Sequence, residues 1–415
     1  MKRRNKLTTE ELEQRELVEK LIKRTQAKTP QDVRTLLSKI SKDIFEVLLE
    51  KELTNHLGYD FHDKENKQTA NSRNGSSSKT LKSDFGNLSI TMPRDRDSSF
   101  KPIVIPKGSR MLEGMEEKIL SLYAMGVTQR DICKFTEDIY GCELSPEAVS
   151  DIVAAVEEKV NEWLMRPLKE TYAMIFMDAA VFNIRTNGSV KNMAVNVLLG
   201  IDLYGRKDIL GFWTCENESA KFWLSVLNDL KSRGVKDTFF FCIDGLKGFS
   251  QAINAVYPES KIQRCIVHQV RYCTRFVNFK DRKELCDDMK KIYKADNEEQ
   301  ALIALDELAK KWDGKYPYVS KSWRENWAEL STFFAYPNEI RRLIYTTNAI
   351  ESFNSLLRKY TKNRGAFMNE MSLYKLIYLA SEKLMKKWSA AIKNWGLIFA
   401  QLNIMYPERL AGYVK

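Results

Sequence analysis

The sequence lacks the long apolar runs and paired cysteines of membrane-spanning and secreted proteins. No uncharged apolar stretch reaches the roughly 18 residues that a membrane-spanning helix needs, and the longest runs, such as TFFFCI, are short. The seven cysteines are scattered without a CxxC pair, and the basic start MKRRNK leads into TTEELEQ rather than an apolar segment. We therefore expect a cytoplasmic protein with free thiols, no secretory signal and no membrane partner.

What the chain has in quantity is apolar residues and positive charge. Its 415 residues are 44% hydrophobic, which excludes a disordered protein, and a prior of about 150 residues per domain suggests two or three domains. Lysine and arginine number 66 against 55 acidic residues, a net charge of +11. This excess favours a polyanionic partner.

The charge is unevenly distributed along the chain. Residues 1–110 hold 23 basic and 16 acidic residues, and residues 261–415 hold 28 basic and 17 acidic residues. Between them, residues 111–160 hold 4 basic and 11 acidic residues, and residues 161–260 hold 11 of each. Anion-binding surfaces are thus expected outside the near-neutral middle. An ordinary solvated surface is the alternative that charge alone leaves open.

The first 58 residues have the pattern of two amphipathic helices. Thr8 and Glu11 have the spacing of a capping box, and apolar residues follow at helical period, at Leu17, Val18, Leu21 and Ile22. Thr29 and Pro30 open a second helix that Gly58 ends. The apolar stripe of this second helix is Val33, Leu36, Leu37, Ile40, Ile44, Leu48, Leu53 and Leu57.

Residues 59–110 change to a basic composition rich in Asn, Ser and Gly. The alternation in LKSDFGNLSITM predicts a hairpin, and residues 66–110 hold nine basic and three acidic residues. The candidates for phosphate contacts here are Lys79, Lys82, Arg94 and Arg96.

Residues 111–165 are similar to a helix-turn-helix. Helices are expected over 116–125 and 128–140, Gly141 breaks the second, and Ser145-Pro146-Glu147 opens a third that could lie in a major groove. A plain three-helix packing unit is equally compatible with the pattern, and the local excess of acidic residues supports it.

From Tyr172 the pattern becomes α/β, and three carboxylates in it have features of a metal site. Asp178 interrupts the buried strand YAMIFMDAAVF, where an acid is costly without a cation, and Asp244 ends the strand TFFFCI. Glu351 starts the helix of TTNAIESFNSLLRK. Singly, Asp244 could be a turn residue before Gly245, and Glu351 a capping-box partner of Asn348. Together they could converge, and oxygen ligands suit Mg²⁺.

Several segments of the chain resemble the bacterial insertion-sequence transposases of the mutator type. They are HLGYD (56–60), NSRNG (71–75), PRDR (93–96), SPEAVSDI (145–152), LLGIDLYGRKDILGFW (198–213), DGLKGFSQAI (244–253), YPESKIQRCIVHQVR (257–271) and TTNAIESFNSLLRK (346–359). The resemblance implies a DDE enzyme with a ribonuclease-H-like core, two Mg²⁺ ions that Mn²⁺ can replace, and Asp178, Asp244 and Glu351 as catalytic metal ligands. Phe182-Asn183-Ile184-Arg185 departs from the family's more basic or aromatic run, so a DNA contact at Asn183 is not carried over.

Further residues near these acids are candidates for structural or DNA-binding roles. Cys265 and His268 form the CIVH pair that the family tends to carry, and we expect it to order a strand end beside the acids. With Cys273 and Cys286, a zinc site is a weaker alternative. The candidate DNA contacts of this half are His268, Arg271, Arg358, Lys359, Lys362 and Arg364. Arg358 lies two helical turns after Glu351, hence on the same face.

The overall prediction is an α+β multidomain protein. The expected parts are an N-terminal helical region (1–58), a basic hairpin and linker region (59–110), a helix-turn-helix domain (111–165), the first part of a ribonuclease-H-like α/β core (170–268), a helical insertion (269–340), and the second part of the core with the catalytic glutamate and C-terminal helices (341–415). The tryptophans of the insertion are expected in its core rather than stacked on bases.

We expect the protein to be a DNA transposase. It would bind the terminal inverted repeats of an insertion sequence, cleave and join double-stranded DNA with metal ions, and act in the nucleoid as a homodimer or larger assembly. The alternatives are a catalytically silent, transposase-derived DNA-binding regulator and a plain metal-dependent nuclease.

Overall fold

The computed structural model describes residues 8–61, 63, 67, 69–246, 248–345, 348–362 and 364–412, so the basic start MKRRNK lies outside the described residues. The chain divides into two compact units. The first comprises Met1–Tyr123 and Val127–Ala154, and the second Ala124–Gly126 and Ala155–Lys415. Among the helices described, none has the length and apolar character to cross a membrane.

The first unit begins with two capped helices, α1 (Thr9–Thr25) and α2 (Pro30–Leu57), as predicted. Thr8 and Thr29 each complete a capping box, and Gly58 ends α2 with a φ of 75°, a left-handed conformation that glycine adopts without a steric penalty. The predicted apolar stripe of α2 is divided. Leu53 and Leu57 are buried, whereas the stripe's residues nearer the N-terminus are largely exposed.

A two-stranded antiparallel hairpin follows, made of β1 (Arg73–Ser83) and β2 (Gly86–Asp95). Its apolar face packs on α2 and forms a small core of Leu49, Leu81, Leu88, Ile90 and Ile105. Asp95, in PRDR, accepts hydrogen bonds from Asn71 Nδ2, in NSRNG, and from the Ser99 hydroxyl. Two of the segments that carry the family resemblance therefore fix the same end of this hairpin.

Three helices complete the first unit: α3 (Glu113–Ala124), α4 (Gln129–Tyr140) and α5 (Pro146–Ala154). Thr128 caps α4, and Gly141 ends it in a left-handed conformation. The helices and the break at Gly141 are those that the sequence predicts, while their action as a helix-turn-helix stays a prediction.

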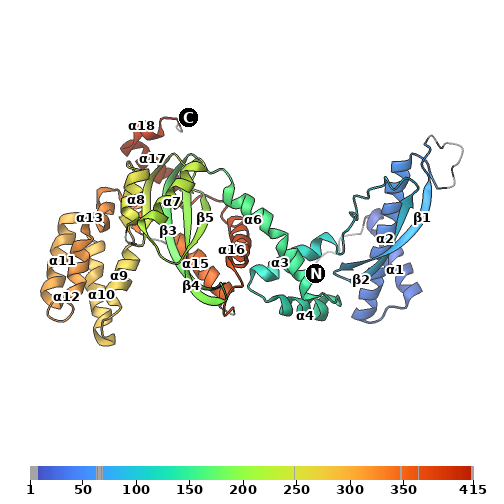
Figure 1. Cartoon of the computed structure of the whole chain (residues 1–415), viewed down its shortest axis with the longest axis horizontal. Helices are drawn as coiled ribbons and strands as arrows, with labels where there is room; N and C mark the ends of the chain where they lie inside the picture. The colour runs from blue at the N-terminus through green and yellow to red at the C-terminus, as the bar shows by residue number, and fades with distance from the viewer. Residues whose placement is uncertain are drawn as a thin grey trace. The chain divides into compact units, whose positions relative to one another are not determined.

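The second unit contains a five-stranded mixed sheet in the order β5-β4-β3-β6-β7. β3 (Thr171–Thr186), β4 (Ser189–Asp202) and β5 (Lys207–Cys215) form an antiparallel meander, and β6 (Asp237–Ile243) and β7 (Lys261–Arg264) run parallel to β3. Figure 1 shows the sheet in the middle of this unit, with helices around it.

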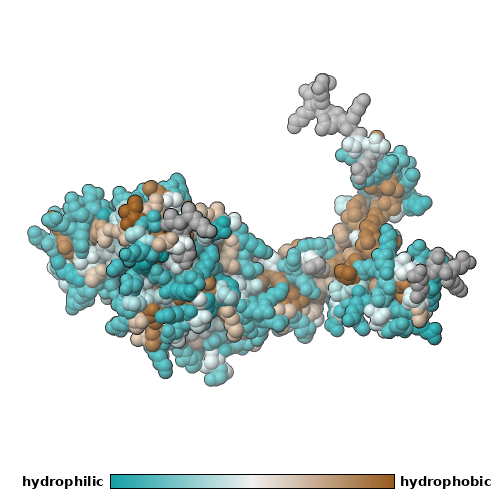
Figure 2. Space-filling model, turned by 90° about the horizontal axis from the view of Figure 1, so that it is seen from above, coloured by the Kyte–Doolittle hydropathy of each residue, from teal (hydrophilic) through white to brown (hydrophobic). Residues whose placement is uncertain are grey.

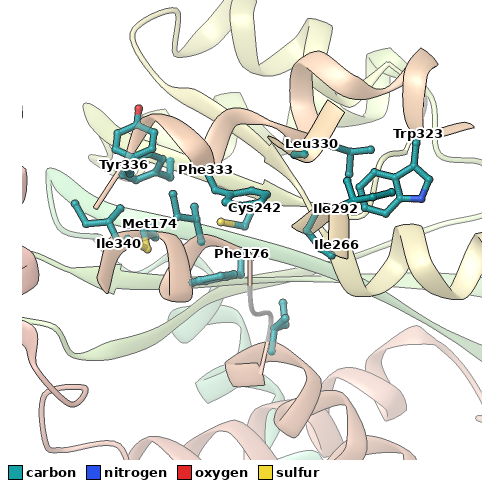
Figure 3. Close-up of a cluster of buried hydrophobic side chains, with 14 of the residues drawn as sticks. Met174, Phe176, Cys242, Ile266, Ile292, Trp323, Leu330, Phe333, Tyr336 and Ile340 are labelled. Atoms are coloured by element: carbon teal, nitrogen blue, oxygen red, sulfur yellow. The ribbon is translucent and has the colours of Figure 1, made fainter. Parts of the chain in front are cut away.

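Helices cover both faces of the sheet. On one face α7 (Ala220–Ser232) and α8 (Phe249–Val256) pack through Trp223 and Phe249 onto Ile175, Met177 and other sheet residues. On the other face Met174 and Phe176 belong to one core with Trp323, Phe333 and Tyr336 from the helical segment. Figure 3 shows Trp323 beside Ile292 at the end of this core away from Met174. The side chains of β3 alternate between these two cores, as the period of a strand requires.

The segment between β7 and the end of the chain is helical. It contains α9 (Ile266–Thr274), α10 (Phe279–Tyr293), α11 (Glu298–Trp312), α12 (Pro317–Glu325), α13 (Trp327–Leu330), the 3₁₀ helix η1 (Thr332–Ala335), α14 (Asn338–Tyr345), α15 (Asn348–Thr361), α16 (Glu370–Met385), α17 (Trp395–Met405) and α18 (Pro407–Leu410). Before the sheet, α6 (Val156–Met165) packs against α16 and β5. Trp312 and Trp323 are buried in the core, and Trp327 packs against it in a half-buried position.

Candidate active site

The register of the sheet brings Asp178 and Asp244 to the same place. β3 and β6 are parallel with Phe176 opposite Cys242, so Asp178, within β3, and Asp244, directly after β6, each stand two residues beyond this pair on adjacent strands. Asp178 shares the face of Phe176 because side chains alternate along a strand, and it is only 5% exposed. Two carboxylates that are 66 positions apart in sequence thus become neighbours.

The carboxylate of Asp178 is held in one orientation. The backbone N–H of Ala179 donates to Oδ1 at 2.9 Å, and the side-chain amide of Asn354 on α15 donates to Oδ2 at 2.6 Å. Asn354 is itself buried. Since each oxygen of the carboxylate accepts one of these hydrogen bonds, the group is oriented before any ligand binds.

His268 on α9 lies against both acids. Its Nδ1 is 3.2 Å from Asp244 Oδ1, and its Nε2 is 3.8 Å from Asp178 Oδ1. Each of the three side chains offers a possible ligand atom, and these atoms all lie within 4.8 Å of one another. The sequence predicts His268 beside the acids but does not predict this direct contact with both of them.

Burial and mutual charge alter the acid–base behaviour of this group. Burial raises the pKa of Asp244 to about 6, against the opposing effect of His268 and with a further contribution from Asp178. Burial alone would lower the pKa of His268, but Cys265 and the two carboxylates raise it to about 9. At neutral pH the imidazolium therefore supplies a positive charge that two adjacent carboxylates require.

Glu351 lies near this group but is not part of the cluster. It is on α15, one turn before Asn354, and its Oε1 is 3.1 Å from Nη2 of Arg271 on α9. Residues three apart share a helix face, so the hydrogen bond of Asn354 to Asp178 keeps Glu351 on the side of α15 that faces the acids. In the structure, Glu351 forms an ion pair with Arg271 and does not join Asp178 and Asp244 in one group.

Several polar atoms at this place have no hydrogen-bond partner. Oδ1 of Asn354 is one of these buried atoms. Nδ1 of His268 and Oε1 of Glu351 are two others, which have ion-pair neighbours in Asp244 and Arg271 but make no hydrogen bond. Unsatisfied buried polar atoms are rare in native proteins and call for a bound ion, water or ligand. Together with two adjacent carboxylates, they fit a divalent cation with oxygen ligands.

The cysteines do not join this cluster. Cys265 is buried at the N-terminus of α9, and its N–H donates to the Ile243 carbonyl at 2.8 Å, which ties α9 to the end of β6. Within the described ranges, the group that could hold a metal consists of Asp178, Asp244 and His268, without Cys273 or Cys286.

A cleft of about 830 Å³ opens beside Asp244 and His268. Cationic and aromatic side chains of β7 and α9 line it, namely Arg264, Arg271, Tyr272 and Arg275. Arg264 lies against the turn after Asp244: its Nη2 donates to the Gly245 carbonyl at 3.2 Å, and its Nη1 donates to Asn326 Oδ1. The acidic Glu325 and Glu329 line the cleft as well, so its three arginines stand beside carboxylates rather than forming a purely positive surface.

The predicted basic run after Glu351 lines a second groove of about 510 Å³. Arg358, Lys359, Lys362 and Arg364 lie on one side of it, with Phe182 and Asn183 of β3 on the other. Asn183 donates to the Gly365 carbonyl at 3.0 Å, so it supports the loop of this groove. This contact gives Asn183 a structural use at the position where the sequence departs from the family pattern.

The four basic candidates of the first unit differ in their surroundings. Arg94 and Arg96 are exposed on and just after β2. Lys79 and Lys82 are half-buried on β1, where their Nζ atoms donate to the carbonyls of Pro106 and Glu143. Any phosphate contact by these two lysines would compete with bonds that they already make.

Two residues of the site were not predicted from the sequence. Asn354 stands three residues after Glu351, at a spacing that could have indicated a shared helix face. Arg264 stands at the end of a short strand, and no local pattern distinguishes it from a surface arginine.

Comparison with known proteins gives a consistent result. The profile of the family described as "Transposase, Mutator family" matches residues 12–391. A probable transposase for an ISRM3-like insertion sequence from Sinorhizobium fredii is 42% identical, and the transposase of ISRM3 from Rhizobium meliloti is 40% identical. Each match covers 90% of this chain and 93% of the relative.

The Staphylococcus aureus transposase of IS256 in Tn4001 is 28% identical over 83% of this chain and 89% of its own. A solved Drosophila P element transposase strand transfer complex aligns with a TM-score of 0.29 and 10% identity, over 72% of this chain and 85% of that one.

Proposed function

Because the chain belongs to the Mutator family of transposases, we propose that its second unit is a ribonuclease-H-like DDE core that cleaves and joins DNA at the ends of an insertion sequence. The strand order supports this assignment. An antiparallel meander of three strands is extended by two parallel strands, with one acid on the first strand and the next at the end of the fourth.

Asp178, Asp244 and Glu351 would hold two divalent ions, with Mg²⁺ as the expected metal and Mn²⁺ as a substitute. The donor set supports this, since two carboxylates already meet and Glu351, which is paired with Arg271, lies on the helix face that is turned towards them. When bound, such ions supply Lewis-acid chemistry, which makes an attacking oxygen more nucleophilic and neutralises charge on the phosphate.

The residues around the acids would orient them and take the negative charge of DNA. Asn354 and the Ala179 N–H fix the carboxylate of Asp178. His268 would stabilise the two carboxylates before metal binds, and Arg271 would exchange Glu351 for a DNA phosphate, because a guanidinium binds either anion. Arg358 and Lys359, exposed on α15, would hold the backbone of the duplex.

The first unit would recognise the ends of the element. Helices α3 to α5 would act as a helix-turn-helix on the terminal inverted repeats, and the exposed Arg94 and Arg96 would contact phosphates. Residues 269–340 would form the helical insertion of the core. Pairing two DNA ends would need a homodimer or larger assembly.

The meeting of Asp178 and Asp244 is the observation that carries the proposal. Its test is strand joining with DNA that carries the element's ends, with Mg²⁺ and without it. A transposase joins the cleaved 3′ end to target DNA only with metal, and a plain nuclease cuts without joining. If the protein binds this DNA but does not cut it in the presence of Mg²⁺, it is a DNA-binding regulator and the proposal is wrong.

A further inference from the structure

We propose that α1 and α2 form a self-association surface, on which the two helices of one chain pack against those of a second copy. The inference deepens the proposed function, because it names the surface through which two transposase chains would hold two DNA ends. It rests on features of the first unit alone: two exposed apolar stripes and the charge pattern of α1.

Helix α2 is apolar on two opposite sides. Leu49 and Leu53 are buried on the side that packs on the hairpin, so that side is already occupied. Val33, Leu37 and Ile44 lie about 120–160° around the helix from Leu49, at 100° per residue. They remain exposed, with Leu37 at 42%. The hairpin therefore covers one apolar side of α2 and leaves the second apolar stripe pointing away from the small core.

Helix α1 has an apolar stripe as well. Leu17, Val18, Leu21 and Ile22 recur at the spacing of one helix face, and Leu17 is 60% exposed. Of the side chains that the structure describes in α1, all are exposed except the half-buried Leu21. The α2 of the same chain thus leaves this stripe uncovered. Figure 2 shows hydrophobic surface gathered along these N-terminal helices.

The charges of α1 identify the partner as a second copy in antiparallel orientation. The N-terminal half of the helix is acidic, with Glu11, Glu13 and Glu16, and its last turn is basic, with Lys23 and Arg24. Glu13 and Arg24 lie on the same flank of the stripe. Two antiparallel copies would place the Glu13 of each beside the Arg24 of the other, which is the self-complementary arrangement of a two-fold interface. A parallel pair would set like charges together.

The test is the molar mass of the full-length protein by light scattering, without DNA or metal, together with its dissociation constant. We expect the wild type to be a dimer of two 48.2 kDa chains. Leu17→Glu and Leu37→Glu should each weaken association at least tenfold. Leu12→Glu is the matched control. Leu12 is 51% exposed in the same helix but about 140° around it from Leu17, so its variant should dimerise as the wild type does.

A charge exchange tests the orientation and guards against misfolded variants. Glu13→Lys and Arg24→Glu should each weaken the dimer, and the double variant should restore it, which a folding defect would not do. A wild type that is monomeric at tens of micromolar would overturn the inference, as would dimers that survive Leu17→Glu and Leu37→Glu. Since the measurement uses neither DNA nor metal, its failure leaves the cleavage chemistry to be judged separately.

Discussion

The hydrogen bond from Asn354 to Asp178 connects the helix of one expected metal ligand with the strand of another. Its length of 2.6 Å and its burial make it the direct link between α15 and the carboxylate. Residues that orient metal ligands from outside the coordination shell matter nearly as much as the ligands themselves. We therefore expect Asn354 to act as a positioning residue for Asp178.

Asn354→Ala should lower strand cleavage by about 10- to 100-fold, the usual cost of losing such a partner. The loss should be smaller in saturating Mg²⁺, because the misplaced carboxylate weakens metal affinity more than the chemical step. Single-turnover cleavage measured across a Mg²⁺ titration tests this. Asn228→Ala, which removes an exposed amide from α7, is the control. An unchanged Mg²⁺ dependence would mean that Asn354 does not position Asp178.

Gly245 holds the turn after Asp244 in a conformation that other residues adopt with strain. Its φ is +74°, and a Cβ at this position would lie 2.2 Å from the guanidinium carbon of Arg264. Gly245→Ala should therefore cost about 1–3 kcal/mol in backbone strain and displace Arg264 from the turn. We expect a lower melting temperature and reduced cleavage together.

Gly314→Ala provides the comparison for Gly245, since a Cβ there meets nothing within 4 Å and its φ is not positive. Thermal unfolding and cleavage of the two variants should differ clearly. Equal behaviour would show that the turn after Asp244 tolerates a side chain and that Arg264 does not constrain it.

Among the helices, α10 and α11 are held together by a buried carboxylate that lies between them. Asp288 accepts hydrogen bonds from Lys291 Nζ at 2.8 Å, Lys311 Nζ at 2.6 Å and Trp312 Nε1 at 2.9 Å. Burial would raise the pKa of Asp288, but these three donors lower it to about 2. The ionised carboxylate of Asp288, with its three hydrogen bonds, therefore helps to hold the two helices together.

The lowered pKa of Asp288 gives a pH dependence of stability. Because the pKa of the folded form lies below that of the unfolded chain, the contribution is full above about pH 4. It is lost as the pH falls towards 2, and it amounts to at most about 2 kcal/mol. Urea unfolding should show Asp288→Asn less stable than the wild type at pH 7, with a difference that shrinks towards pH 2.5.

Asp287→Asn, at an exposed neighbouring position, should change stability little at either pH. A difference between wild type and Asp288→Asn that stays constant with pH would contradict the charged, bonded state of Asp288.

The sequence predicts the elements well because their signals are local. Capping at Thr8 and Thr29 and the breaks at Gly58 and Gly141 are found where they are predicted. Strands β3 and β6 and the buried position of Asp178 also follow from residue pattern, whereas the four-residue β7 is not predicted. What pattern does not give is the parallel register of β3 with β6, which brings Asp178 and Asp244 together, since that register depends on packing.

The same limit applies to α9 and to the first unit. The contacts of His268 with both acids and of Arg271 with Glu351 depend on how α9 packs on the sheet, which no spacing encodes. The apolar stripe of α2 reads in sequence as one core face. Only the hairpin's position shows that Leu53 is covered while Leu37 is not.

At the scale of the whole molecule, DNA affinity should come from phosphate contacts that salt screens. Each phosphate that is neutralised contributes about 0.9 to the slope of log affinity against log salt. Arg358→Ala with Lys359→Ala should therefore reduce that slope by up to about 2 for duplex DNA of any sequence. Fluorescence anisotropy at several salt concentrations measures it.

Lys221→Ala with Lys231→Ala removes the same charge from α7, whose helix packs on the opposite face of the sheet from Asp178. This control should leave the slope nearly unchanged. If the two double variants behave alike, the groove beside α15 is not a specific phosphate-binding surface.

The proposed role of the three acids as metal ligands is tested most directly by DNA cleavage with Asp178→Ala, Asp244→Ala and Glu351→Ala, measured on terminal-repeat DNA with Mg²⁺ beside binding to the same DNA. We expect each substitution to abolish cleavage while binding to the ends persists, because each carboxylate would serve as a metal ligand and the DNA contacts would lie elsewhere. Near-normal cleavage by any one of the three variants would contradict it.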